Sequence, residues 1–379
     1  MKLIKKITAA ALAGMLMLSA TACHKKNETA VTVGGVKFTS AYYMCAMIYS
    51  DMQARQKVDD AKSSDTSSDS STSSETDYTK EKIDGVDYSK YVKDETLKSL
   101  KKIAAYKLLC EKNKLETDKD TADQIKQSAE SMWSYGYSTM FENNGVYKAT
   151  FLQYTADSNY AETYFDHVYG KDGTNPVSAE EVSAKMLEKF VLLQYINASF
   201  TTTDSSTGSS TKLSDDEITS LKTKINGYAD EINSGKKTFE QVYHEYNNTE
   251  ESSDNQSSSD ETTEDTAEEL KPVYNHASVY GDSDTVYKND NYGTVKEMTA
   301  GQAKVIELAD DGGLLLVVKR DLASDPYYVD LLDSPTRHLL KDADMDKELE
   351  AFLKDVKIDV SSYATDRFKV KKIKYPSAS

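Results

Sequence analysis

Histidine is the side chain best suited to acid–base catalysis and metal binding near neutral pH, so the histidines of this chain are the first candidates for chemistry. There are five: His24, His167, His244, His276 and His338. No two have the short spacing of a metal site, and the chain contains no G-x-S-x-G, H-E-x-x-H or P-loop motif. We therefore expect structural roles for all five, and neither a metal nor a cofactor.

A cysteine is the next candidate, at the end of the N-terminal segment MKLIKKITAAALAGMLMLSATAC. Three lysines precede a mostly apolar run from Ile7 to Leu18, and small residues then lead to Cys23, which is the order found in a secretory signal peptide. The end of the segment resembles a bacterial lipobox, whose cysteine becomes the first mature residue and carries lipid. We expect lipidation of Cys23 and a protein anchored outside the cytoplasm to the bacterial cell membrane. The alternative is an ordinary signal peptide cleaved near Ala22.

The other two cysteines are Cys45 and Cys110, and both lie within apolar helical patterns. An oxidising compartment would permit them to pair. No C-x-x-C or Cys/His group is present, and the apolar surroundings favour two buried free thiols.

The composition narrows the class of protein. The 379 residues allow two or three domains, and the 63 acidic against 46 basic side chains leave a net charge of −17, which argues against nucleic acid as a partner. Three segments rich in Ser, Thr or acidic residues cannot offset their chain entropy by burial, so we expect disorder at 61–77, 201–212 and 249–270. A calcium site in the acidic segment is disfavoured, because the spacing of an EF-hand loop is missing.

Between these segments the sequence predicts regular helices and strands. A strand, a Gly-Gly turn and a second strand lead into a helix from about Ser40, and further helices are expected at 94–113, 120–133, 148–169 and 178–188, the last with an S-A-E-E capping box. The 26 tyrosines and 11 methionines are interpreted first as core-filling residues on these helices, and second as an adaptable apolar groove for unfolded chains. Residues 31–188 are thus predicted to be mostly helical.

The next part of the chain has a mixed pattern. Residues 189–200 are strand-like, and two helices follow at 214–235 and 238–247, the first with a capping box formed by Ser214 and Glu217. Two strands are expected at 302–308 and 313–320. The last of these contains GGLLLVVKRD, the most apolar stretch beyond the N-terminus. This order predicts a small α+β domain, 189–322, and the overall fold class α+β. Residues 323–379 predict a helix and extended pieces that pack back on the first domain.

The order of these features resembles the PrsA-type foldase lipoproteins and the SurA-like periplasmic chaperones. VTVGGVKFTSAYY is similar to the family's entry strand and helix, INSGKKTFEQVYHEYN to its G-x-x-F-x-x-L-A element, and VKEMTAGQAKVIELADDGGLLLVVKRD to its last turn and hairpin. The resemblance implies a helical chaperone domain around a parvulin-type prolyl isomerase domain. It divides the chain into a signal peptide (1–22), a lipidated tether (23–30), the chaperone domain (31–188), the parvulin-like domain (189–322) and a returning tail (323–379).

The sequence departs from the family pattern at the positions that form the isomerase site of a parvulin-type domain. Aligned with the family, Tyr195 stands where the first strand has a histidine, and Leu315 stands where the last strand has one. Tyr292 is the nearest candidate for the aromatic residue of the groove. We therefore expect a degenerate parvulin-like domain, weak or inactive as an isomerase, in a chaperone that binds unfolded secreted proteins. The alternatives are an active peptidyl-prolyl isomerase and a substrate-binding lipoprotein of a transporter, although the latter's βαβ alternation is missing.

Overall fold

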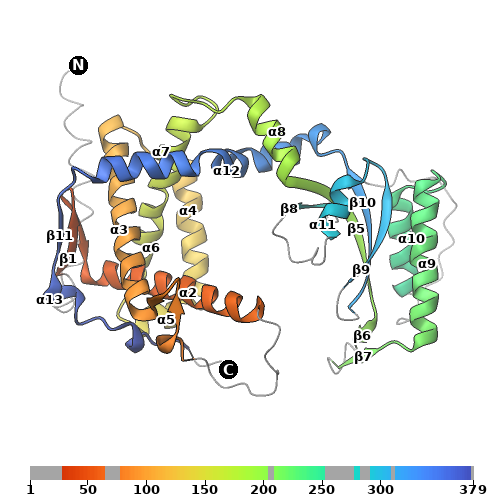
Figure 1. The fold of residues 1–379 in the computed structure, drawn as a ribbon, viewed down its shortest axis with the longest axis horizontal. Coiled ribbons are helices and arrows are strands. Elements are labelled where there is room, and N and C mark those ends of the chain that lie inside the picture. Colours follow the sequence, from red (N-terminus) through yellow and green to blue (C-terminus); the bar gives the residue numbers. More distant parts are fainter. Residues whose placement is uncertain are drawn as a thin grey trace, which may run out of the picture. The chain divides into compact units, whose positions relative to one another are not determined.

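The computed structural model describes residues 28–64, 77–203, 209–251, 277–281, 291–308 and 312–376. The chain divides into two compact units, which we call the helical unit (1–176 and 341–379) and the inserted unit (177–340) (Figure 1). The predicted signal peptide and Cys23 lie outside the described residues, as do most of 61–77 and 249–270. The fold class is α+β, as predicted.

The helical unit begins with a hairpin that the sequence predicted. Strands β1 (Thr29–Val33) and β2 (Val36–Thr39) pair antiparallel across Gly34 and Gly35, whose φ angles of 57° and 93° favour glycine. Strand β11 (Ile358–Val360) from the C-terminal tail pairs with the other edge of β1, in the order β11-β1-β2. The tail therefore completes a sheet that the N-terminal segment starts.

Helices supply the rest of this unit, with α2 at its centre. In chain order they are α2 (Ser40–Ser64), α3 (Tyr88–Asn113), α4 (Lys119–Met132), α5 (Ser138–Asn143), α6 (Lys148–Ser158), α7 (Tyr160–Tyr169) and the second half of α12 (Pro326–Leu353). Short elements join them: the 3₁₀ turn η3 (Tyr78–Lys80), the hairpin β3 (Lys82–Ile83) and β4 (Val86–Asp87), the π-helix η4 (Trp133–Tyr137), α13 (Ser362–Thr365) and η8 (Val370–Lys372).

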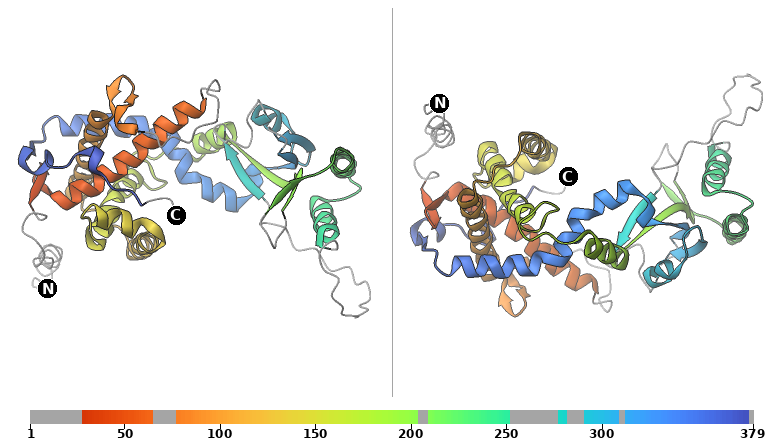
Figure 2. Two further views of the ribbon diagram at one scale, coloured as in Figure 1. Left: turned by 90° about the horizontal axis from the view of Figure 1, so that it is seen from below. Right: turned by 90° about the horizontal axis from the view of Figure 1, so that it is seen from above.

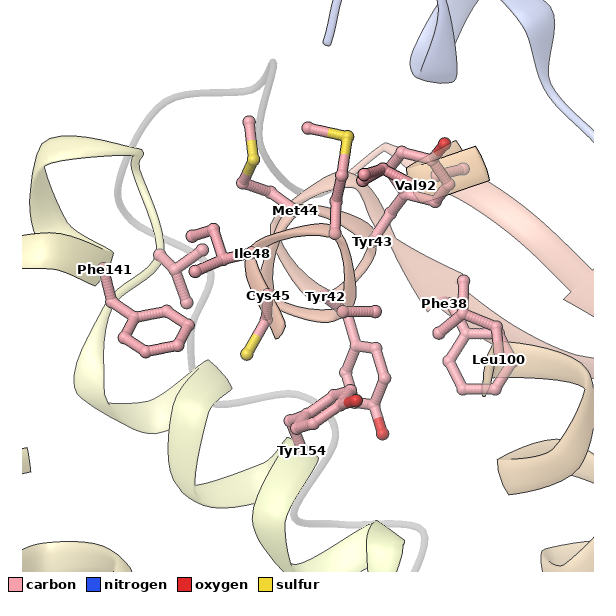
Figure 3. Close-up of a cluster of buried hydrophobic side chains, with 14 of the residues drawn as sticks. Phe38, Tyr42, Tyr43, Met44, Cys45, Ile48, Val92, Leu100, Phe141 and Tyr154 are labelled. Carbon is pink, nitrogen blue, oxygen red and sulfur yellow. The ribbon is translucent and has the colours of Figure 1, made fainter. Parts of the chain in front are cut away.

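The core of the helical unit contains many aromatic and sulfur-containing side chains among its aliphatic ones. Tyr42, Tyr43 and Met47 of α2 are buried, and Tyr42 lies beside Tyr154 of α6 with ring centroids 5.4 Å apart (Figure 3). The first interpretation of the tyrosines and methionines, that they fill a core, is confirmed for these residues.

The inserted unit is built on a four-stranded antiparallel sheet in the order β8-β5-β10-β9. Its elements are α8 (Ala179–Lys189), β5 (Phe190–Ser199), β6 (Thr201–Thr203), β7 (Ser210–Lys212), α9 (Asp215–Asn233), α10 (Phe239–Glu251), β8 (Ala277–Gly281), α11 (Asn291–Glu297), β9 (Ala303–Leu308), β10 (Gly313–Arg320), η7 (Leu322–Ser324) and the first half of α12. Both predicted capping boxes are present, at Ser178 with Glu181 and at Ser214 with Glu217.

The two faces of this sheet have different cover. Helices α9 and α10 pack on one face, which carries Ile196, Leu314 and Leu316 (Figures 1 and 2). The opposite face contacts Val295 of α11 and Met298, the residue just after it. Because both faces are buried, β10 needs apolar side chains at consecutive positions, which explains the run of Leu and Val in its sequence.

A glycine sets the close pairing of β10 with β5. Gly313 has φ 133°, and a Cβ placed there would lie 2.3 Å from the carbonyl oxygen of Ala198. From this glycine onward β10 pairs with β5 through Arg320, which lies opposite Leu192. The predicted strands 189–200 and 313–320 are thus neighbours in one sheet.

The structure differs from the sequence predictions at several boundaries. The boundaries between the two units fall at Pro176–Val177 and Leu340–Lys341, whereas the sequence predicted 188–189 and 322–323. The first boundary lies earlier because α8 packs against β5. The second lies later because the first half of α12 belongs to the inserted unit. The sequence predicted disorder at 201–212, but β6 and β7, in this segment, pair antiparallel. Residues 204–208, between the two strands, lie outside the described residues. Helix α2 continues to Ser64 and α10 to Glu251, into the other two segments.

Candidate functional site

Strands β5 and β10 bring Tyr195 and Leu315 onto the same face of the sheet. Tyr195 lies opposite Val317 and Leu315 lies opposite Asn197, so the two residues are diagonal neighbours across the strand pair. Side chains that lie directly opposite one another in an antiparallel pair share a face. We call this the Tyr195 face; it is the face covered by α11, opposite to the one covered by α9 and α10.

The Tyr195 face is an apolar cluster. The Leu315 side chain is only 3% exposed, and the half-buried Tyr195 packs against the same cluster. The other members are Val191, Leu193, Val295, Met298, Ile306, Leu308 and Val317. Leu315 is therefore a packing residue of this apolar cluster.

Two lysines fix α11 over this face. The Lys296 ammonium donates to the carbonyl oxygen of Glu188, and Lys319 Nζ donates to the carbonyl oxygen of Lys296 at 2.6 Å. Burial, and then the nearby positive charge of Lys296, hold the pKa of Lys319 below its ordinary value. Both cations make hydrogen bonds to backbone oxygens, so they act here as tethers of the helix.

The chemistry available on the Tyr195 face follows from its titratable groups. Among the described side chains that β5, β9 and β10 place there, these are Tyr195, Lys304 and Lys319, with neither a histidine nor a carboxylate. Such a set offers an apolar contact surface and a phenol. It lacks a paired acid and base that could organise a hydrogen-bonded network. Tyr292, the predicted groove aromatic, lies near the start of α11, and its side chain is outside the described part of the structure.

The histidines do not gather anywhere in the described residues. His167 lies on α7, His244 on α10 and His338 on α12, each half-buried, whereas His24 and His276 fall outside the described ranges. Within the described chain, no group of three or more His, Cys, Asp or Glu side chains could hold a metal ion.

Cys45 on α2 and Cys110 on α3 are both buried free thiols, which confirms the prediction made from their apolar surroundings. Burial raises the pKa of the Cys45 thiol, and burial followed by the charge of Glu111 raises the pKa of Cys110 to about 11. Both therefore remain protonated near neutral pH, and a protonated thiol is a poor nucleophile.

The sequence reasoning missed a buried polar site in the helical unit. The Asp51 carboxylate is 1% exposed and accepts three hydrogen bonds: from Tyr88 Oη at 2.9 Å, Arg55 Nε at 2.9 Å and Tyr375 Oη at 2.6 Å. The Arg55 guanidinium also lies over the ring of Tyr375, 4.0 Å from its centroid. An Asp–Arg pair four residues apart inside an apolar helix was the available indication, because a buried carboxylate needs partners.

No helix in the described ranges is both long enough and apolar enough to cross a bilayer.

No model of a known protein family matches the chain, and no curated protein matches it. Among solved structures, the chain is similar to the foldase protein PrsA from Streptococcus pneumoniae, with 10% identity, a TM-score of 0.34 and coverage of 68% of this chain and 77% of that one. It is also similar to the foldase protein PrsA from Lactococcus lactis, with 10% identity, a TM-score of 0.35 and coverage of 89% of this chain and 96% of that one.

Proposed function

We propose that this protein is an extracytoplasmic, lipid-anchored chaperone that assists the folding of secreted proteins, with a parvulin-like unit that is weak or inactive as a prolyl isomerase. The observation that carries the proposal is the insertion of residues 177–340, with their antiparallel sheet, into a helical unit built from both ends of the chain. This is the arrangement that the sequence resemblance to the PrsA and SurA families implies. The N-terminal segment ending at Cys23 supports export and lipidation.

The chemistry of the Tyr195 face supports the loss of isomerase activity. Prolyl isomerisation breaks no bond, so a catalyst must favour the twisted amide over the planar one against a barrier of about 18–20 kcal/mol for ordinary amides. An apolar slot supplies contact with the proline ring. The hydrogen-bonding network that the resembling family builds from two histidines has no counterpart in Tyr195 and Leu315, because leucine neither donates nor accepts a hydrogen bond.

Two assays on the protein without its first 23 residues test the proposal. We expect it to suppress the aggregation of a reduced, unfolded client at stoichiometric concentration, and to leave the isomerisation rates of a panel of Xaa-Pro peptides at the uncatalysed value. Turnover near that of an active parvulin would favour the alternative of a working isomerase. If the protein fails to suppress aggregation of several unrelated clients, the chaperone proposal is wrong.

The anchor is tested separately in the full chain. We expect Cys23→Ala to prevent the incorporation of labelled palmitate and to release the protein from the membrane fraction. Retention of the variant in that fraction without label would overturn lipidation as the anchor.

A further inference from the structure

The C-terminal residues Ile373, Lys374 and Tyr375 cross the surface of the helical unit without regular secondary structure. We propose that they occupy a binding site for extended peptides of the form apolar-x-Tyr, which the chain fills with its own tail and which a peptide of the same chemistry can enter. The use of this site for unfolded clients rests on the proposed function. The site itself rests on the contacts that the tail makes with Asn144, with Asp51 and with the core cluster.

The first element of the site is a backbone clamp at Asn144. Its Nδ2 donates to the carbonyl oxygen of Lys374 at 2.8 Å, and its Oδ1 accepts from the Lys374 amide at 2.9 Å. One side-chain amide therefore satisfies both backbone groups of a single residue. The Lys374 side chain is exposed, so this position selects for an extended backbone and not for a side chain.

The second element is a phenol pocket centred on Asp51. Tyr375 Oη donates to Asp51 Oδ2 at 2.6 Å, and Arg55 stacks between the Tyr375 ring, at 4.0 Å from its centroid, and the Tyr78 ring, at 4.5 Å. A hydrogen bond from a neutral donor to a buried carboxylate is stronger than one between neutral groups. The pocket therefore distinguishes tyrosine from phenylalanine.

The third element is an apolar contact two residues before the tyrosine. The partly buried Ile373 packs against the core cluster of the helical unit, as does the Tyr375 ring. The pattern of the bound segment is thus an apolar side chain, a residue read through its backbone, and a tyrosine.

The groups that hold the tail keep their positions through other partners. Asp51 also accepts from Tyr88 Oη and from Arg55 Nε, and the second Nδ2 hydrogen of Asn144 is donated to the carbonyl oxygen of Met140 at 2.7 Å. None of these partners, Tyr88, Arg55 and Met140, belongs to the tail. Preorganised groups lose less entropy on binding, which favours a site that a second peptide can use.

The test uses the chain without residues 1–23 and with the tail released by the double substitution Ile373→Ser and Tyr375→Ala. The probe is a fluorescein-labelled peptide, KKIKYPS, added in trans and followed by fluorescence anisotropy. We expect saturable binding to the released variant and much weaker binding to the wild-type protein, whose site is filled. The same peptide with Phe in place of Tyr should bind at least about tenfold more weakly, because one hydrogen bond to a charged group is lost.

Controls identify the site. Asn144→Ala added to the released variant should abolish binding. Tyr363→Ala in the wild-type protein removes a tyrosine that is 69% exposed, and this variant should bind the peptide as weakly as the wild-type protein does. If the released variant is folded by circular dichroism and does not bind the peptide, or binds the Phe peptide equally well, the site is overturned.

A second measurement covers the case in which the released variant does not fold. In the wild-type protein, the Lys374 amide should be protected from hydrogen exchange, and excess unlabelled peptide should remove that protection by displacing the tail. Unchanged protection at saturating peptide would overturn exchange at the site. Peptide binding without suppression of client aggregation would leave the site standing and contradict the proposed function.

Discussion

The phenol of Tyr42 donates a 3.0 Å hydrogen bond to Oδ2 of Asp157, inside the core of the helical unit. Gln153 Nε2 donates to the other carboxyl oxygen at 2.7 Å. Burial is the largest influence on this carboxyl and raises its pKa above the ordinary value, while Lys107 and the two hydrogen bonds act in the opposite direction. The folded state therefore favours the protonated carboxyl more than the unfolded state does.

Substitution of Asp157 by Asn tests this balance through pH. Because the folded pKa is raised, the stability contributed by the protonated carboxyl is present below the unfolded pKa of about 3.8 and is lost as the pH rises through the folded pKa. Asn does not ionise, so the melting temperature of Asp157→Asn minus that of wild type should increase between pH 4 and pH 7. Tyr42→Phe removes a donor to the carboxylate and should steepen the pH dependence. A difference that is constant with pH would contradict the interpretation.

Leu315 should matter for folding in proportion to its burial. We expect Leu315→Ala to lower the free energy of unfolding by about 3 kcal/mol, because it removes a buried side chain and leaves a cavity beside α11. Asn197, which lies opposite Leu315 and is exposed, is the matched control, and Asn197→Ala should change stability by less than about 0.5 kcal/mol. Urea unfolding of both variants makes the comparison, and equal effects would show that Leu315 is not a core residue.

The two buried thiols should be unreactive in the folded protein. With residues 1–23 removed, Cys45 and Cys110 are the cysteines that remain. At pH 8 we expect almost no reaction with Ellman's reagent in buffer and two equivalents in denaturant, because burial keeps both thiols protonated and covered. Zero equivalents in denaturant without reductant would instead show that the two cysteines pair.

The capping box of α9 should contribute measurably to the inserted unit. Ser214 Oγ accepts from the Glu217 amide, and Glu217 Oε2 accepts from the Ser214 amide at 2.8 Å. Ser214→Ala should cost about 1 kcal/mol of stability through the loss of the cap. Ser220 lies on the exposed surface of the same helix, so Ser220→Ala should stay within about 0.5 kcal/mol of wild type. Thermal unfolding measures both, and an equal cost would assign the effect to serine itself and not to the cap.

Features governed by neighbouring residues were determined by the sequence alone. The Gly-Gly turn at 34–35, the capping boxes at Ser178 and Ser214, and the strand at 313–320 all depend on backbone preference or on a run of apolar residues, and the structure has each of them. The exception is 201–212, where β-branched residues pair into a short hairpin that the Ser/Thr-rich composition did not indicate.

Contacts between distant parts of the chain were decided only by the tertiary structure. The diagonal placement of Tyr195 and Leu315 depends on the register of β5 against β10, and a slip of one residue would move every side chain to the other face. The hydrogen bond from Tyr375 to Asp51 joins residues 324 positions apart, which no local pattern indicates. The sequence shows which side chains are available, whereas the packing within each unit selects those that share a buried site, because burial makes an unpaired polar group costly.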